Sequence, residues 1–168
     1  MKVMKTSLVL AGIFAVAFCG GCAQKTTQPK EIQTPEKCKD IMEELLEGAD
    51  GISTDTKLFY GEEKYEEFFE YLYETSYDRV SDGAYAYASE AVADELTVIH
   101  ANEEKDVKVI RGHLEERVER RMSDFMGYKP DEVEKLENAI IFVEGQYILM
   151  VVCDDPEEIV DKFKEIDK

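Results

Sequence analysis

Apolar residues recur at helical spacing in four segments of this chain, of which three precede residue 130. Over residues 37–47 they return every three or four positions, which predicts an amphipathic helix that Gly48 ends. Residues 62–74 show the same spacing with aromatic side chains, so we expect a helix there, with a strand as the alternative because aromatic residues favour sheets. The longest stripe runs from an Asn102 cap to about Met126 and predicts a long helix that Gly127 ends.

Other segments have the composition and alternation of strands. Residues 84–89 and 95–101 are expected to form two of them, although an alanine-rich helix is an alternative for the first. A turn or short helix over 130–137 should precede a hairpin of residues 139–143 and 147–153. Because the second strand of that hairpin is apolar on both faces, it should lie inside a sheet.

A last helix is expected to begin after Asp155. This residue stands at the N-cap position, Pro156 at the first helical position and Glu158 at the third, and apolar spacing continues to Ile166. The resulting order, ββαββα after a helical lead-in, predicts an α+β fold. We expect a two-layer sandwich, with helices packed on one face of a mostly antiparallel sheet.

The first 21 residues have the anatomy of a secretory signal. Lys2 and Lys5 precede an apolar run from Leu8 to Phe18 that holds about 11 residues. Such a run is too short to cross roughly 30 Å of hydrocarbon as a stable helix. We therefore expect residues 1–21 to be removed.

The end of this leader, Phe18-Cys19-Gly20-Gly21-Cys22, resembles the lipobox of bacterial lipoproteins, in which small residues precede a cysteine that carries diacylglycerol. Gly20 and Gly21 fit that pattern, whereas Cys19 stands where leucine is usual. We expect cleavage before Cys22 and acylation of its sulfur, because two or three acyl chains anchor a protein stably. One alternative is lipidation at Cys19, which would put bulky Phe18 at the cleavage position. Another is a redox or metal pair of Cys19 and Cys22.

The chain between the lipid and the fold reads as a tether. Residues 22–36 comprise the lipidated cysteine and a stretch rich in Thr, Gln, Lys and Pro, in which Ile32 is the one large apolar residue. The remaining residues, 37–168, suit a single α+β domain with one core.

The charge balance is strongly acidic, with 38 acidic against 20 basic residues and a net charge of -18. Removal of residues 1–21, which contain two lysines and no acid, would make it -20. Such a charge disfavours nucleic acid and anionic headgroups as partners. It suits cations, basic partners or simple solubility.

Several short motifs follow one another along the domain. They are Leu58-Phe59-Tyr60-Gly61, Ala93-Asp94-Glu95-Leu96, Phe125-Met126-Gly127-Tyr128-Lys129-Pro130, Asn138-Ala139, Gly145-Gln146-Tyr147 and Val151-Val152-Cys153-Asp154-Asp155. Their order resembles that of the bacterial domain of unknown function 4358, over roughly residues 38–163. The family consists largely of small lipoproteins and extracytoplasmic proteins of Gram-positive anaerobes, so the resemblance implies that location. It implies no activity and no catalytic residue.

Candidate catalytic and metal-binding residues are few. Acyl transfer needs a nucleophile with a base within about 3 Å, and the sequence contains no G-x-S-x-G. His100 and His113, the two imidazoles, lack metal-ligand spacing, so a surface or packing role is expected. Asp154, Asp155 and Glu158 could collect Ca²⁺, although capping of the last helix explains this segment without a metal ion.

Ten of the 17 aromatic residues lie between Phe59 and Tyr87. Core packing is the expected role, and the alternative is a surface that binds glycan or peptide, because tyrosine suits interfaces. The candidates for that surface are Tyr71, Tyr73, Tyr77, Tyr85 and Tyr87. Cys38 and Cys153 stand at apolar positions and are expected to be buried free thiols, with a disulfide as the alternative.

Together these patterns predict a lipid-anchored protein on the outer face of a cell membrane, in a Gram-positive bacterium. We expect it to bind another envelope protein or a cell-wall component without catalysis, and to carry no cofactor besides the lipid on Cys22. The alternatives are a small hydrolase or cell-wall-acting enzyme and a cation-binding acidic surface protein. Oligomeric state is left open by the sequence.

Overall fold

The computed structural model describes residues 37–89 and 91–168. Its helices in this part of the chain are α1 (Cys38–Leu46), α2 (Tyr65–Tyr73), α3 (Glu104–Tyr128), α4 (Val133–Glu137) and α5 (Pro156–Glu165). Its strands are β1 (Thr56–Phe59), β2 (Val80–Tyr87), β3 (Glu95–Ala101), β4 (Ile140–Glu144) and β5 (Tyr147–Val152). The short 3-10 turns η1 (Tyr77–Arg79) and η2 (Pro130–Glu132) precede β2 and α4. None of the described helices has the length and apolar composition needed to span a bilayer.

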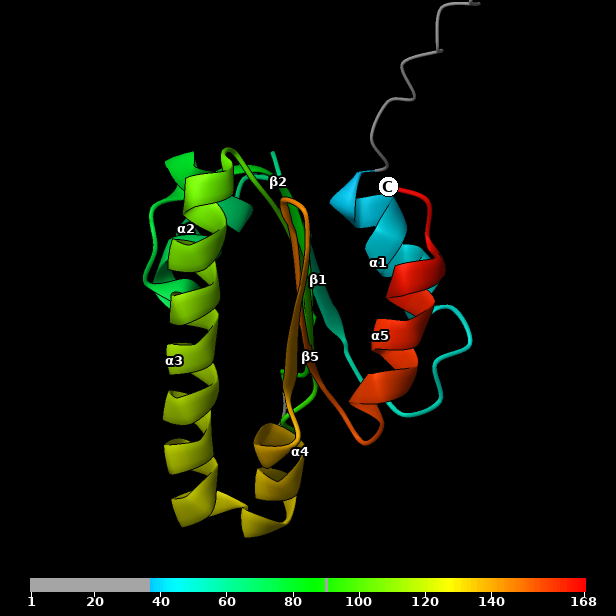
Figure 1. Ribbon diagram of the computed structural model, residues 1–168. Coiled ribbons are helices and arrows are strands. Elements are labelled where there is room, and N and C mark those ends of the chain that lie inside the picture. Colours follow the sequence, from blue (N-terminus) through cyan, green and yellow to red (C-terminus); the bar gives the residue numbers. More distant parts are fainter. Residues whose placement is uncertain (1–36, 90) are drawn as a thin grey trace, which may run out of the picture. The chain divides into compact units, whose positions relative to one another are not determined.

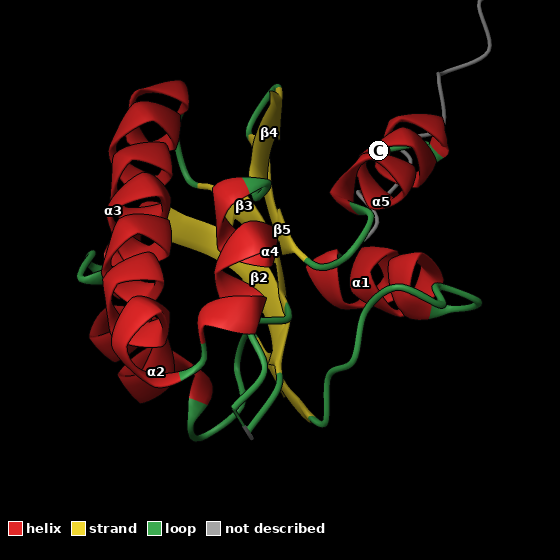
Figure 2. Ribbon diagram, turned by 90° about the horizontal axis from the view of Figure 1, so that it is seen from below, coloured by secondary structure: helices red, strands yellow, loops and turns green. Residues whose placement is uncertain are grey.

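The five strands form one sheet in the order β1-β2-β3-β5-β4, and every neighbouring pair is antiparallel. Helices cover both faces of this sheet (Figures 1 and 2). On one face, α1 packs against β2 and β3, and α5 packs against β4 and β5. On the other face, α3 crosses β3, β5 and β4 and also contacts α2 and α4. The outer strands of the sheet are β1, with four residues, and β4.

The α+β class and the antiparallel sheet predicted from the sequence are confirmed. The placement of the helices differs, because they pack on two faces and not on one. The cause lies in β3 and β5. All six residues of β5 are buried, so apolar side chains project from both sides of the sheet and each side needs a cover.

Several elements also differ from the sequence prediction. Strand β1 was not expected, and it pairs with β2 from Thr56 to Phe59. Strand β2 begins at Val80, four residues before the predicted start. Helix α3 continues through Gly127 to Tyr128, because the residue that stops it is Pro130, which forces Lys129 out of the helical conformation.

A buried ionic network joins α3 to the sheet through Glu95, the first residue of β3, which is 0% exposed. Arg117 binds its carboxylate through two nitrogens, with Nε 2.8 Å from Oε1 and Nη2 2.8 Å from Oε2. Arg121 Nη1 lies 2.8 Å from Oε2, and the Tyr73 hydroxyl donates to Oε1 at 3.0 Å. Burial alone would raise the pKa of Glu95, but the two guanidinium groups outweigh it and hold the pKa below its usual value.

Arg117, together with Arg120, also secures α2. The carbonyl oxygen of Leu72, in the last turn of that helix, accepts hydrogen bonds from Arg117 Nη1 at 3.5 Å and Arg120 Nη2 at 3.2 Å. These bonds satisfy a backbone group that a helix end leaves without an internal partner. Arg117 also lies over the ring of Tyr73, 5.4 Å from its centroid. Therefore α2, α3 and β3 are connected through one group of side chains.

We expect Glu95→Gln to lower the free energy of unfolding by about 3–5 kcal/mol, because it leaves two buried guanidinium groups without their counter-charge. Urea unfolding at pH 7 measures the loss. Glu116→Gln, at an exposed pair with His113, is the matched control and should have little effect. The pKa of Glu95 is lower in the folded than in the unfolded chain. The stabilisation that Glu95 provides is therefore present above about pH 4.3 and is lost as the pH falls further. If the stability of the wild-type protein and that of Glu95→Gln fell equally with decreasing pH, this assignment would be wrong.

A close approach of α2 to β2 depends on a glycine. The hydroxyl of Tyr65 lies over Gly83, where an added Cβ would be only 1.8 Å from the hydroxyl oxygen and 2.9 Å from the ring carbon that carries it. This hydroxyl is buried and finds no hydrogen-bond partner among the described residues. The backbone of β2 therefore has to be free of a side chain at this position.

Gly83→Ala should destabilise the protein by about 1–3 kcal/mol through overpacking. Tyr65→Phe should be close to neutral, because the hydroxyl that it removes makes no hydrogen bond with the described residues. In the double variant we expect part of the loss to be recovered, which a thermodynamic cycle from thermal or urea unfolding measures. Strict additivity of the two substitutions would show that the contact does not limit position 83.

Candidate functional site

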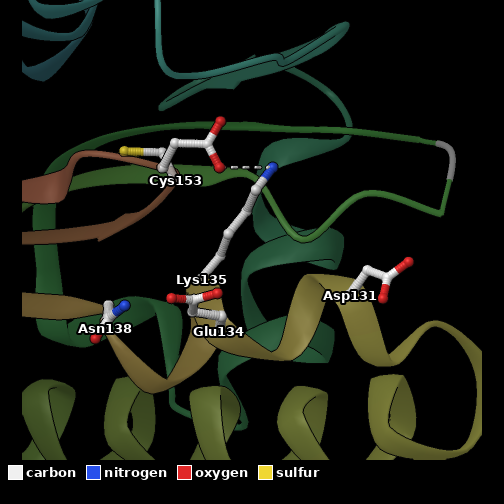
Figure 3. A pocket seen from close by; sticks show the side chains of 6 residues that line it. Asp131, Glu134, Lys135, Asn138 and Cys153 are labelled. Carbon is white, nitrogen blue, oxygen red and sulfur yellow. Dashed lines mark ion pairs between the residues drawn. The ribbon is translucent and has the colours of Figure 1, made fainter.

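A polar cavity of about 230 Å³ lies at the end of the sheet where β3 begins and β5 ends. Its walls come from η2, α4 and the segment after β5 (Figure 3). The lining residues are Asp131, Glu134, Lys135, Asn138, Cys153 and Asp154. We refer to it as the α4 pocket.

Lys135 is the one cation in this lining, and three carboxylates hold it. Its Nζ lies 2.8 Å from Asp94 Oδ1, 3.3 Å from Glu132 Oε2 and 3.5 Å from Asp154 Oδ1. The last of these pairs is the dashed line in Figure 3. Burial alone would lower the pKa of Lys135, but Asp94 and Glu132 outweigh it and raise the pKa, so the ammonium stays charged.

The carboxylates beneath Lys135 are themselves fixed by backbone groups. Asp94 Oδ2 accepts a hydrogen bond from the Ser53 amide at 2.6 Å, and Glu132 Oε2 accepts one from the Ala93 amide at 2.9 Å. Fully engaged groups of this kind hold their geometry when a ligand arrives. The ammonium of Lys135 in the α4 pocket is therefore held in a fixed position.

The rim of the α4 pocket carries an excess of negative charge. Asp131 and Glu134 are exposed, and among the described residues no cation pairs with either of them. The ammonium of Lys135 is already balanced by the carboxylates around it. A cationic group entering the pocket would thus meet carboxylates and little opposing charge.

The two cysteines of the domain are free and buried, as the sequence predicted. Cys153 lines the α4 pocket but is only 1% exposed, and burial together with Asp94 and Asp154 raises the pKa of its thiol to about 11. Burial and the nearby Asp82 also raise the pKa of Cys38. Neither thiol is a thiolate at neutral pH, so neither is activated for nucleophilic chemistry.

The tyrosines named from the sequence do not form one surface. Tyr73 and Tyr85 are 0% exposed and pack in the core, while Tyr77 and Tyr87 are half-buried. Tyr71 is 78% exposed on the outer side of α2. There it lines a shallow, mostly apolar groove of about 290 Å³ together with Glu67 and Phe68, which we call the α2 groove.

One arrangement was missed in the sequence. The ladder between β2 and β3 shifts register between Val80 and Asp82, so Ser81 bulges out and its Oγ lies 2.6 Å from His100 Nδ1. Sequence offers no signal for it, because a bulge depends on strand pairing. Among the described residues no carboxylate hydrogen-bonds the imidazole, and His113 forms a separate exposed pair with Glu116.

The acidic segment after β5 serves the fold. Asp155 caps α5, since its Oδ1 accepts from the Glu158 amide at 3.4 Å, and Asp154 pairs with Lys135. Within residues 37–89 and 91–168, no three His, Cys, Asp or Glu side chains are grouped as a metal site. Asp154, Asp155 and Glu158 therefore do not converge on a common point.

Fold and pocket together define the class of protein: an α+β domain with one antiparallel sheet and an acid-rimmed cavity at one end. Residues 59–153 match the family model of the Domain of unknown function (DUF4358), which is more than half of the chain. The chain therefore belongs to this family, as the sequence motifs suggested. The match covers β2 to β5 and most of the α4 pocket, and α1 and α5 lie outside it. No curated protein and no solved structure matches the chain.

Proposed function

We propose that this protein is an extracytoplasmic lipoprotein, anchored through acyl chains on Cys22, that acts by binding a cationic group in the α4 pocket. The observation that carries the binding proposal is the charge of that pocket. Its one cation, Lys135, is held by three carboxylates, while Asp131 and Glu134 on the rim have no cationic partner among the described residues.

Support for the anchor comes from the sequence alone. The signal-like leader and Phe18-Cys19-Gly20-Gly21-Cys22 lie outside the described residues, as do the tether and Ile32. A tether of 15 residues, 22–36, could extend to about 50 Å. This reach would let the domain meet a cell-wall component or a second envelope protein.

The location of the α4 pocket, far from the segment that leads to the anchor, agrees with this proposal. The described chain enters at Lys37, and the Cys38 amide donates to Asp82 at the end of β2 where that strand pairs with His100. The α4 pocket lies at the opposite end of β3, next to Asp94. The segment that leads to the anchor and the proposed binding site are thus separated by the length of the sheet.

The second candidate function is a small hydrolase, and Ser81 with His100 is the observation that favours it. Their hydrogen bond joins a hydroxyl to an imidazole, as in serine nucleophiles. Burial lowers the pKa of His100, so the ring is neutral at pH 7 and could accept a proton. A third group that orients the base is, however, missing from the described residues.

Binding of a metal cation by the acidic surface is a further alternative.

Anchoring predicts that the protein sediments with membranes and enters the detergent phase on Triton X-114 partition. Cys22→Ser should block acylation and shift the protein to the uncleaved or aqueous form, whereas Cys19→Ser should leave it anchored. Mass spectrometry of the N-terminal peptide identifies the acylated residue. A Cys22→Ser protein that is still cleaved and acylated would exclude this anchor.

Binding predicts that a small organic cation occupies the α4 pocket, and spermidine is the probe. Asp131→Asn combined with Glu134→Gln should weaken its binding by roughly tenfold, the sum of two partly exposed charge interactions. Glu157→Gln, at an exposed position of α5, is the control and should have no such effect. Titration calorimetry at low and high salt measures both, with Ca²⁺ as a parallel probe.

If Glu157→Gln weakened spermidine binding as much as Asp131→Asn with Glu134→Gln does, spermidine would respond only to the overall charge. The α4 pocket would then be rejected as its binding site. Tighter binding of Ca²⁺ than of spermidine would favour the metal alternative. Treatment with a fluorophosphonate decides the hydrolase alternative, because phosphonylation of Ser81 that is lost in His100→Gln would reveal a nucleophile. We expect Ser81 to remain unlabelled.

A further inference from the structure

The outer side of α2 carries apolar surface that the fold does not cover. Tyr65, Phe69 and Tyr73 form its inner stripe and are fully buried in the core. On the other side, Tyr71 is 78% exposed and lines the α2 groove with Phe68 and Glu67. Large exposed tyrosine beside an apolar depression is typical of a protein interface.

Negative charge surrounds this groove. Residues 62–74 contain six glutamates and one lysine. Glu70 binds the Tyr77 amide at 3.1 Å, and Glu74 pairs with Arg120 at 3.5 Å. Glu67 lines the groove, is exposed, and pairs with no described cation. An occupant of the groove must therefore combine apolar and positively charged groups.

The charge decides between possible occupants. A second copy of this chain, with a net charge of -18, would bring like charges together around the groove. An anionic membrane surface is disfavoured for the same reason. With about 290 Å³, the groove is at the lower limit of cavities that enclose a drug-sized ligand, which span about 300–1,000 Å³. A side chain of a protein segment fits these conditions better than a small molecule.

We propose that the α2 groove docks a basic, amphipathic segment of a second protein. An apolar side chain of that segment enters the groove between Phe68 and Tyr71, and a lysine or arginine of the segment pairs with Glu67. Like the aromatic anchors of other interfaces, Tyr71 supplies contact area at low cost in side-chain entropy. This surface is separate from the α4 pocket, so the two proposals stand or fall independently.

The test is site-directed photo-crosslinking of the full-length protein in its native membrane. p-Benzoylphenylalanine at position 71 should give an adduct on irradiation. The same residue at position 128 is the matched control, since Tyr128 is 74% exposed and lies outside the groove. Support requires that the crosslinked peptide belongs to another protein and carries a net positive charge.

Charge reversal tests the complementarity. Glu67→Lys should reduce the adduct at position 71 at least tenfold, whereas Glu157→Lys, at an exposed position of α5, should leave it unchanged. Both side chains are exposed, so each reversal should change the thermal unfolding only slightly. Asp131→Asn with Glu134→Gln should also leave this adduct intact, which separates the groove from the pocket.

Several results would overturn the proposal. They are no adduct at position 71, an equal adduct at position 128, an adduct with lipid or with a second copy of this chain, and an adduct that survives reversal of Glu67. An acidic crosslinked peptide would do the same, because it would contradict the charge argument.

Discussion

The fold depends on one buried charge. Glu95 is fully buried at the start of the central strand β3. Its carboxylate stabilises the structure only because Arg117, Arg121 and Tyr73 all hydrogen-bond to it. Two of these partners come from α3 and one from α2, so both helices must dock in one register to satisfy the charge. Arg121 extends the network, since its Nη1 also donates to the Ala93 carbonyl at 2.9 Å. The segment before β3, which contributes Asp94 to the α4 pocket, is thereby fixed by the same interactions.

The sequence predicted elements wherever burial leaves a regular arrangement of apolar residues along the chain. Helix α5 was foreseen from its cap and apolar spacing, and the interior position of β5 from its unbroken apolar run. Strand β1 has only four residues, all but one partly buried, and leaves no such pattern. The second layer of helices could have been anticipated, because a strand that is apolar on both faces needs a cover on both. It was missed because helix periodicity does not specify the face of the sheet on which a helix packs.

The candidate site was less accessible to sequence reasoning than the fold. Lys135 meets Asp94 and Asp154 only because β3, α4 and the segment after β5 converge at one end of the sheet. In a chain with 38 acids, no spacing rule separates these carboxylates from the rest. Tyr71 was among the residues considered for a surface, but the alternation that separates it from buried Tyr73 became clear only in the folded helix. Contacts over long sequence distances thus determine both the pocket and the groove.

The margins of the sheet have a consequence for crowded surroundings. An outer strand with unpaired backbone groups is a template onto which another chain can add. Here both margins are short, because β1 has four residues and β4 has five. Little backbone is therefore available for strand addition between molecules. Short sheet margins of this kind limit the growth of fibrils where molecules are crowded.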